Sequence, residues 1–336
     1  MTDSNNQLTL SKEQIDSVIA LYSKGQYQEA IDQIKALNEV YPNVPLLFNL
    51  IGACYKELGQ LELSIKMFET AVSIKPNYAE AHKNLGITLR DLGQLDVAVE
   101  SLKRAIEVEP NYVDAHYNLA ITFKELNQLE NALQSYKKTI IINPNFAEAH
   151  NNLGITLDDL GKLNAAIDCY EKVITINPDY SEAHKNLGFI HLKLGKNKVA
   201  ANCFERAIAI NPNYAEAHKH LGYVFKKNKK IDKALAYFER AREIKPDMDF
   251  ILGDILNSKM HLCLWNGLLS EFNELAKRIN NHEKVIAPFP LLPLIDDPEL
   301  LRKNTEVFVK EIYPRDNTLP KIDRYPRHQK IRIGYF

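Results

Sequence analysis

The sequence has few cysteines, no excess of charge of either sign and no long apolar run, and each of these features excludes a class of protein. Only four cysteines occur among 336 residues, none in a CxxC pair, and there is no N-x-S/T glycosylation site. A disulfide-stabilised secreted protein is therefore not expected. Lys and Arg number 42 against 43 Asp and Glu, so the basic surplus of a nucleic-acid-binding protein is missing.

The sequence also lacks the segments that direct a protein to a membrane. The first residues, MTDSNNQLTLSKEQ, contain neither the basic nor the apolar segment of a secretory signal. No uninterrupted apolar stretch is long enough to span a bilayer. Hydrophobic residues still make up 45% of the chain, which is enough for a substantial core. We expect a folded cytoplasmic protein with neither membrane nor nucleic-acid partners.

Motifs that carry chemistry are missing as well. The chain has no Gly-rich phosphate loop, no nucleophile elbow and no metal-binding motif. We therefore assign no catalytic residues and expect no cofactor or metal in this chain. Whether the chain is part of an enzyme is left open by these absences.

What the sequence does contain is a repeat, marked by proline at a fixed interval of 34 residues. The prolines are Pro42, Pro76, Pro110, Pro144, Pro178, Pro212 and Pro246. The third unit, Ala79 to Tyr112, reads AEAHKNLGITLRDLGQLDVAVESLKRAIEVEPNY. Its apolar positions fall on one face of a first helix and one face of a second helix. Each unit is therefore predicted to be a helical hairpin.

This repeat closely resembles the tetratricopeptide repeat. The resemblance covers seven units, residues 11–248, and implies an all-α fold in which stacked hairpins form a right-handed superhelix with a concave surface. Small residues recur where the two helices of each hairpin are expected to approach each other. They are Gly86, Gly154, Gly188 and Gly222 in first helices and Ala98, Ala132, Ala166, Ala200 and Ala234 in second helices.

Asparagine occupies the sixth position of four successive units: Asn84, Asn118, Asn152 and Asn186, here called the asparagine row. In tetratricopeptide-repeat proteins the first helices line the concave surface. An amide carries both a donor and an acceptor, so such a row can bind the main chain of an extended peptide without reading its side chains. The alternative is a set of solvated polar positions.

The asparagine row and the opening of the repeats, as in AEAHNNLG from Ala147 to Gly154, resemble the repeat arm of protein O-linked N-acetylglucosamine transferases. In that family the matching asparagines hold the acceptor protein. The resemblance thus implies peptide binding by the row. Histidine also recurs, at the fourth position, but successive histidines belong to different hairpins and lack a metal-binding pattern. We interpret them as packing residues.

The 34-residue period stops after Pro246. We predict a helical extension over residues 249–312, with helices at 249–264, at 268–279 and from Pro298 to Ile312, and an irregular segment at 287–294. Residues 1–10 are predicted to be a tail and residues 313–329 a linker. The last seven residues, Lys330 to Phe336, alternate like a strand that has no partner in this chain.

The extension adds to the family resemblance. Trp265-Asn266-Gly267, the segment from Pro288 to Leu294, Asp296-Asp297-Pro298 and the closing Ile331 to Tyr335 resemble the junction of bacterial, Spindly-type O-linked N-acetylglucosamine transferase-like glycosyltransferases. The resemblance implies that residues 330–336 begin a catalytic region. A UDP-sugar would bind in that catalytic region and not in the repeats or the extension.

Two functions follow as hypotheses. The first is a scaffold that holds proteins or extended peptides as the acceptor-binding arm of a UDP-sugar-dependent protein O-glycosyltransferase. The second is a free-standing tetratricopeptide adaptor that assembles a cytoplasmic complex. A stop codon directly after Phe336 would favour the second.

Overall fold

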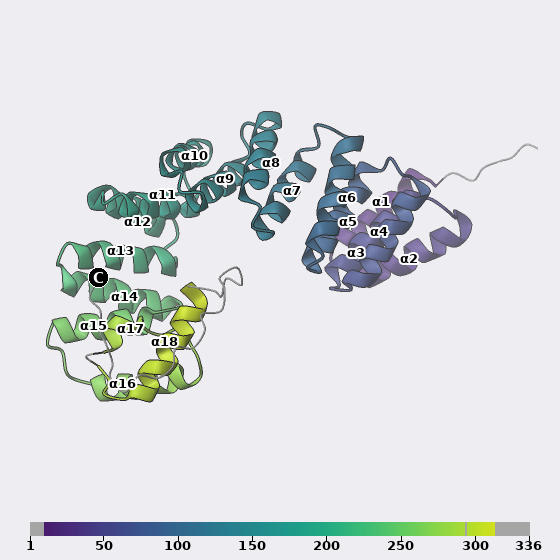
Figure 1. The fold of residues 1–336 in the computed structure, drawn as a ribbon. Coiled ribbons are helices and arrows are strands. Elements are labelled where there is room, and N and C mark those ends of the chain that lie inside the picture. Colours follow the sequence, from purple (N-terminus) through teal and green to yellow (C-terminus); the bar gives the residue numbers. More distant parts are fainter. Residues whose placement is uncertain (1–9, 293, 313–336) are drawn as a thin grey trace, which may run out of the picture. The chain divides into compact units, whose positions relative to one another are not determined.

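The computed structural model describes residues 10–292 and 294–312, and the regular structure in this part of the chain is all helical. The predicted all-α fold of successive helical hairpins is thus confirmed (Figure 1). The predicted tail up to residue 9, the linker at 313–329 and the strand at 330–336 lie outside the described residues.

The chain divides into two compact units, residues up to 210 and residues from 211 onward. The first unit holds six hairpins. Their helices are α1 (Lys12–Ser23), α2 (Tyr27–Val40), α3 (Pro45–Glu57), α4 (Leu61–Ile74), α5 (Ala79–Asp91), α6 (Leu95–Val108), α7 (Val113–Glu125), α8 (Leu129–Ile142), α9 (Ala147–Asp159), α10 (Leu163–Ile176), α11 (Ser181–Lys193) and α12 (Asn197–Ile210).

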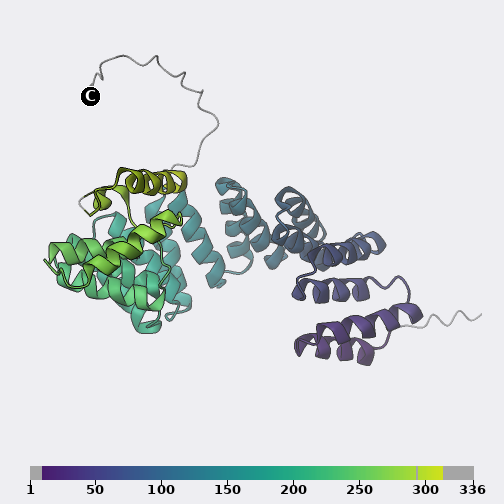
Figure 2. The same ribbon diagram turned by 90° about the horizontal axis from the view of Figure 1, so that it is seen from below.

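The second unit holds the seventh hairpin and the extension. Its helices are α13 (Ala215–Lys227), α14 (Ile231–Ile244), α15 (Ile251–His261), α16 (Leu268–Asn280), α17 (Pro288–Leu291) and α18 (Pro298–Ile312). Within each hairpin and between successive hairpins of a unit, neighbouring helices along the chain pack side by side, as Figures 1 and 2 show from two directions.

The predicted close approach within each hairpin is present. A Cβ atom on Gly154 would lie 2.7 Å from Cε1 of Tyr170, and one on Gly222 would lie 2.5 Å from Cε1 of Phe238. No side chain fits at such distances without a shift of its neighbour. Ala98 and the equivalent alanines on the second helices are fully buried. Glycine at position 8 therefore lets the two helices of a hairpin meet.

The turn inside each hairpin has a left-handed residue at position 15. Glycine supplies it in five hairpins, among them Gly93 (φ 82°) and Gly161 (φ 70°). The fourth and seventh hairpins use Asn127 (φ 57°) and Lys229 (φ 59°) instead. Asparagine tolerates this conformation, but lysine adopts it at a cost in free energy.

The array starts with a well-formed helix cap. The hydroxyl of Ser11 accepts a hydrogen bond from the backbone N–H of Gln14, and the side chain of Gln14 accepts one from the backbone of Ser11. This reciprocal pair satisfies two backbone donors that the first turn would otherwise leave open. Ser11, the first residue of the first predicted repeat, is therefore the N-cap of α1.

The extension contains the predicted helices with changed bounds, and the helix predicted over 249–264 spans only Ile251–His261. The helix predicted from residue 249 begins at Ile251, because Phe250 adopts a left-handed conformation with φ 64°. The segment 287–294 was predicted to be irregular, but a single helical turn, α17, begins at Pro288. Proline is tolerated in the first turn of a helix, where its missing N–H is not needed. Asp297 caps α18 as expected, accepting from the N–H groups of Glu299 and Leu300.

Candidate functional site

The asparagine row lies on the first helices α5, α7, α9 and α11, with all four side chains partly exposed. Partial exposure is what a binding role requires, because a buried amide is unavailable and a fully solvated one is not oriented. The structure places the row within the first unit, one residue on each of four consecutive hairpins.

Three members of the row bond to the preceding hairpin. The Nδ2 atom of each donates to the residue 35 positions earlier, at the fifth position of the hairpin before. The bonds are Asn84 to Asn49 Oδ1 at 3.0 Å, Asn152 to Tyr117 Oη at 2.9 Å and Asn186 to Asn151 Oδ1 at 3.1 Å. These bonds join neighbouring hairpins and fix the orientation of each amide.

In these three residues the amide oxygen has no hydrogen-bond partner within residues 10–292 and 294–312. Each therefore keeps its amide oxygen as an acceptor for a group from outside, although the amide of Asn152 also bonds to Tyr136. The sequence alone did not show that Nδ2 is bonded and Oδ1 is not. The partner of Nδ2 lies in another repeat, at a position where the residue type varies.

Asn118 differs from the other three. Its Oδ1 accepts from Arg90 Nη1 at 3.1 Å, and its Nδ2 donates to the backbone oxygen of Asp114 at 2.8 Å. Both ends of this amide are occupied, so Asn118 is the least available member of the row. The structure thus separates four residues that look equivalent in the sequence.

A second polar series crosses the same junctions at positions 12 and 13. Lys56 pairs with Asp91 at 3.2 Å, Arg90 with Glu125 at 3.8 Å and Lys124 with Asp159 at 3.6 Å, each time with the cation in the earlier hairpin. At the next junction the order reverses, and Asp158 of the fifth hairpin pairs with Lys193 of the sixth at 2.6 Å.

The histidines at position 4 have a structural partner. The Nε2 atom of each lies within hydrogen-bond distance of the carbonyl oxygen of the repeat proline six residues earlier, as in His150 and Pro144 at 3.0 Å. The same contact occurs at His82, His116, His184 and His218. No group of three or more potential metal ligands occurs in the described part of the chain. The position-4 histidines thus tie each first helix to the end of the preceding unit.

Burial affects the charge state of one of these histidines. Loss of solvation lowers the pKa of His150 below its usual 6.5, although the contact with the Pro144 oxygen opposes this. The neutral imidazole is the form that needs least solvation, and its protonated Nε2 donates to the carbonyl oxygen.

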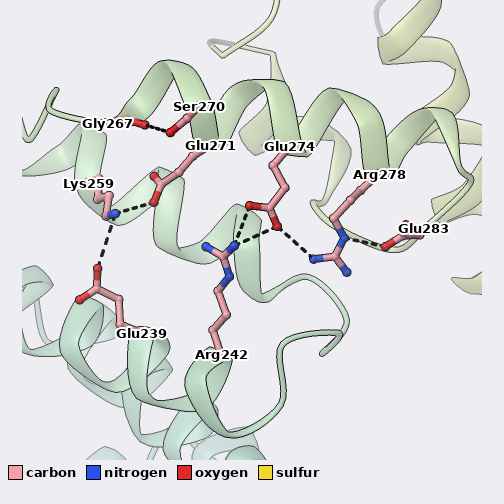
Figure 3. A network of polar contacts seen from close by, with 9 residues as sticks. All are labelled: Glu239, Arg242, Lys259, Gly267, Ser270, Glu271, Glu274, Arg278 and Glu283. Atoms are coloured by element: carbon pink, nitrogen blue, oxygen red, sulfur yellow. Dashed lines mark hydrogen bonds and ion pairs between the residues drawn. The ribbon is translucent and has the colours of Figure 1, made fainter.

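The seventh hairpin is tied to the extension by a network of ion pairs (Figure 3). The guanidinium of Arg242 on α14 donates to both oxygens of Glu274 on α16, at 2.9 and 2.7 Å. Lys259 on α15 lies between Glu271, at 2.7 Å, and Glu239, at 3.6 Å. The network makes the extension a packed continuation of the seventh hairpin.

At the C-terminal end of α16 the network continues through Arg278. Its Nε lies 2.6 Å from Glu283, and this bond lowers the pKa of the Glu283 carboxyl. Arg278 also contacts Glu274 at 3.9 Å (Figure 3).

The loop between α15 and α16 and the first turn of α16 expose apolar side chains. Trp265 is 62% exposed and Leu269 is 75% exposed, and Leu264 beside them is also exposed. Contiguous exposed apolar residues of this size mark contact surfaces. None of the described helices has the length and apolar character needed to cross a bilayer.

Comparison with known proteins places the repeats in a family. Profiles described as tetratricopeptide repeat match residues 147–180, 169–198 and 186–249, and a TPR repeat profile matches 52–89, 86–126 and 122–161. Together these matches run without a gap from residue 52 to residue 249, more than half of the chain.

Among curated proteins, anaphase-promoting complex subunit 3 of Dictyostelium discoideum is 36% identical over 52 residues, which are 16% of this chain and 5% of that protein. The chain thus spans only a small part of that relative's length. Among solved structures, the C-terminal part of a TPR repeat-containing protein from Cytophaga hutchinsonii has a TM-score of 0.58 and 19% identity, with 71% of this chain and 98% of that chain covered.

PilF of Pseudomonas aeruginosa is similar to the same degree, with a TM-score of 0.54 and 20% identity, covering 69% of this chain and 97% of that chain. At these identities the solved structures support the fold alone. The fold agrees with the repeat profiles and with the packing of glycine and alanine inside each hairpin. The chain belongs to the tetratricopeptide-repeat family.

Proposed function

We propose that this chain is a protein-binding scaffold whose first helices hold an extended polypeptide, with the asparagine row contacting the guest main chain. The observation that carries the proposal is the state of the amides at Asn84, Asn152 and Asn186. Each is partly exposed, held by a bond to the preceding hairpin and left with an unpartnered oxygen among the described residues. An oriented acceptor loses little conformational entropy on binding.

The spacing of these acceptors supports a main-chain contact. Asn84 and Asn152 are two repeats apart and Asn152 and Asn186 one repeat apart, so their oxygens recur at whole multiples of the repeat, and a peptide main chain presents N–H groups at regular intervals as well. A contact made through the main chain accepts many guest sequences. A scaffold that serves several guests requires this tolerance.

As a finer proposal, this scaffold is the acceptor-binding arm of a UDP-sugar-dependent protein O-glycosyltransferase. The support is the resemblance of the asparagine row and of the Trp265-Asn266-Gly267 junction to that family. The exposed side chains of Leu264, Trp265 and Leu269 fit this proposal, because a catalytic region that follows the extension would need an apolar surface to pack on.

The main-chain contact can be tested with peptides selected from a random library for binding to the immobilised chain. Their affinity is measured by fluorescence anisotropy for the wild type and for the Asn84→Ala, Asn152→Ala, Asn186→Ala triple variant. Each hydrogen bond contributes about 0.5–1.5 kcal/mol, so we expect affinity to fall roughly 10- to 100-fold. The matched control replaces the exposed Asn131, Asn145 and Asn164 by alanine and should bind as the wild type does.

A chemical version of the test acts on the guest instead. N-methylation of alternate peptide groups removes main-chain donors and leaves the side chains unchanged. We expect the methylated peptide to lose affinity for the wild type and to lose much less for the triple variant. Equal losses for both proteins would show that the amide oxygens do not bind the main chain.

The finer proposal is tested by the mass of the native protein. An antibody raised against the repeats is used to blot an extract of the host, and the band is compared with the 38.4 kDa of this chain. A much larger product, with UDP-sugar transferase activity in the immunoprecipitate, is the expected result. A band at the mass of the chain would favour the free-standing adaptor.

A further inference from the structure

The second unit contains a cavity of about 210 Å³ between the first helix of the seventh hairpin and the extension. Its lining has a polar part and an apolar part. The polar part is Tyr223 of α13 and Asp254 of α15, and the apolar part includes Phe250, Ile286, Pro290 and Phe308. Tyr223 is at the ninth position of its repeat, three residues after the position that carries the asparagine row in earlier hairpins.

The polar end of the cavity can accept a hydrogen bond. The hydroxyl of Tyr223 donates to Oδ2 of Asp254 at 2.5 Å, and Nζ of Lys226 lies 3.6 Å from Oδ1. The distance from Lys226 is that of an ion pair and is too long for a good hydrogen bond. Since a carboxylate can accept about four hydrogen bonds, Asp254 keeps acceptor capacity beside the cavity, although its side chain is only 15% exposed.

The charges around the cavity disfavour a charged occupant. The positive charges of Lys226 and Lys219 both interact with the carboxyl group of Asp254. Nζ of Lys219 also donates a hydrogen bond to the backbone oxygen of Asp249 at 2.5 Å. A cationic guest group would approach two lysines, and an anionic one would approach the carboxylate of Asp254. A neutral group that donates a hydrogen bond satisfies the site without introducing a charge.

The apolar part favours an aromatic ring. The rings of Phe250 and Phe308 meet edge to face, with centroids 6.0 Å apart and planes at 72°. A third ring can add to such a pair in an offset or edge-to-face arrangement. The cavity volume of about 210 Å³ suits one side chain and excludes a helix or strand.

We infer that this cavity binds one tyrosine side chain of the polypeptide guest, with the ring against Phe250 and Phe308 and the phenol donating to Asp254. The inference rests on the proposed function, because it takes the guest to be a polypeptide. It adds a side-chain preference, located in the second unit, to the main-chain contacts proposed for the first unit. The guest is then recognised at one point and held without sequence preference elsewhere.

The experiment uses two small probes, N-acetyl-L-tyrosinamide and N-acetyl-L-phenylalaninamide, titrated into the full chain and followed by NMR. For the wild type we expect the tyrosine probe to bind about tenfold more tightly than the phenylalanine probe, since one hydrogen bond to a charged acceptor is worth about that factor. In Asp254→Asn, which keeps the size of the side chain, the ratio should fall below about threefold.

A filled cavity gives the second variant. Ala287→Trp should abolish binding of both probes, and Ala165→Trp, on an exposed position of α10, is the matched control that should leave binding unchanged. Circular dichroism and the unfolding midpoint show whether each variant is folded. Binding that survives Ala287→Trp in a folded protein would overturn the inference, as would equal affinity of the wild type for the two probes.

The outcome is separable from that of the proposed function. Library peptides that depend on the asparagine row, together with no binding of the tyrosine probe, would reject the cavity inference alone. Binding of the probe at the cavity without any peptide binding would reject the scaffold proposal.

Discussion

Asn186 donates a hydrogen bond to Oδ1 of Asn151 at 3.1 Å, so a side chain of the sixth hairpin is oriented by the fifth. Asn151 is only 2% exposed, and its contribution to a binding surface is therefore indirect. The relationship has a consequence for stability as well as for recognition.

We expect Asn151→Ala to lower the free energy of unfolding by about 1 kcal/mol, because it removes one partner of a partly buried hydrogen bond. The side-chain amide signal of Asn186 in ¹H–¹⁵N NMR spectra should also shift and exchange faster with solvent. An unchanged Asn186 signal in the variant would show that the bond does not orient this amide in solution.

Lys229→Gly should stabilise the protein. Lys229 is exposed and has φ 59° in a turn where five other hairpins have glycine, so the substitution removes strain of about 1 kcal/mol. We expect a higher midpoint of urea unfolding for the second unit, read from a fluorescent label placed there. Lys230→Gly, at the neighbouring residue with φ −96°, is the control and should not raise the midpoint.

Gly154→Ala tests the contact inside the fifth hairpin. Alanine is the better helix former by about 1 kcal/mol, but its Cβ would lie 2.7 Å from the ring of Tyr170, and overpacking costs about 1–3 kcal/mol. We expect a net loss of about 1 kcal/mol in chemical denaturation. A gain in stability would mean that Tyr170 moves aside freely. Ala120→Gly, at the equivalent position of the fourth hairpin, is the reverse change and should lower stability, because it loses helix propensity and a fully buried methyl group.

Arg242 and Glu274 should be coupled in a double-mutant cycle of Arg242→Met and Glu274→Gln. Both side chains are partly exposed, so we expect a coupling of about 1 kcal/mol at low salt. At 1 M NaCl the coupling should fall, because charges are then screened beyond about 3 Å. The exposed pair Arg302 and Glu306, 2.6 Å apart against 2.7 Å for Arg242 and Glu274, is the comparison and should couple by no more than about 0.5 kcal/mol.

Acidification should destabilise the first unit. Burial lowers the pKa of His150 in the folded chain below the 6.5 of the unfolded chain. At a pH between the folded and the unfolded pKa, the unfolded chain therefore binds more protons. Stability is then full above about pH 7 and falls as the pH drops through 6.5 towards the folded pKa. The slope of unfolding midpoint against pH should be smaller in His150→Asn.

The repeat pattern predicted the hairpins because its causes are local. Gly154 and Ala166 are 12 residues apart, and each hairpin brings them together in the same way. The cap at Asp297 was equally readable, since Asp before Pro needs only the next turn of the chain. Such features depend on a few neighbouring residues and repeat where those residues repeat.

The contacts between elements were not predictable in the same way. Asn152 bonds to Tyr117 whereas Asn186 bonds to Asn151, so the partner changes although the position does not. The cavity between Tyr223 and Phe308 joins a residue of the last repeat to residues of the extension, which has no period. Such contacts follow from how neighbouring helices are rotated against each other, and one sequence contains no direct record of that rotation.

The reversed pair of Asp158 and Lys193 limits how this array can change its number of repeats. Loss of the fifth hairpin would place Lys124 against Lys193, and its duplication would place Asp158 against a copy of Asp159. Loss of the third or fourth hairpin would still match a cation with a carboxylate, Lys56 with Glu125 or Arg90 with Asp159. Loss of the third or fourth hairpin therefore keeps opposite charges paired at the new junction. Loss or duplication of the fifth hairpin instead places like charges together, which disfavours both changes.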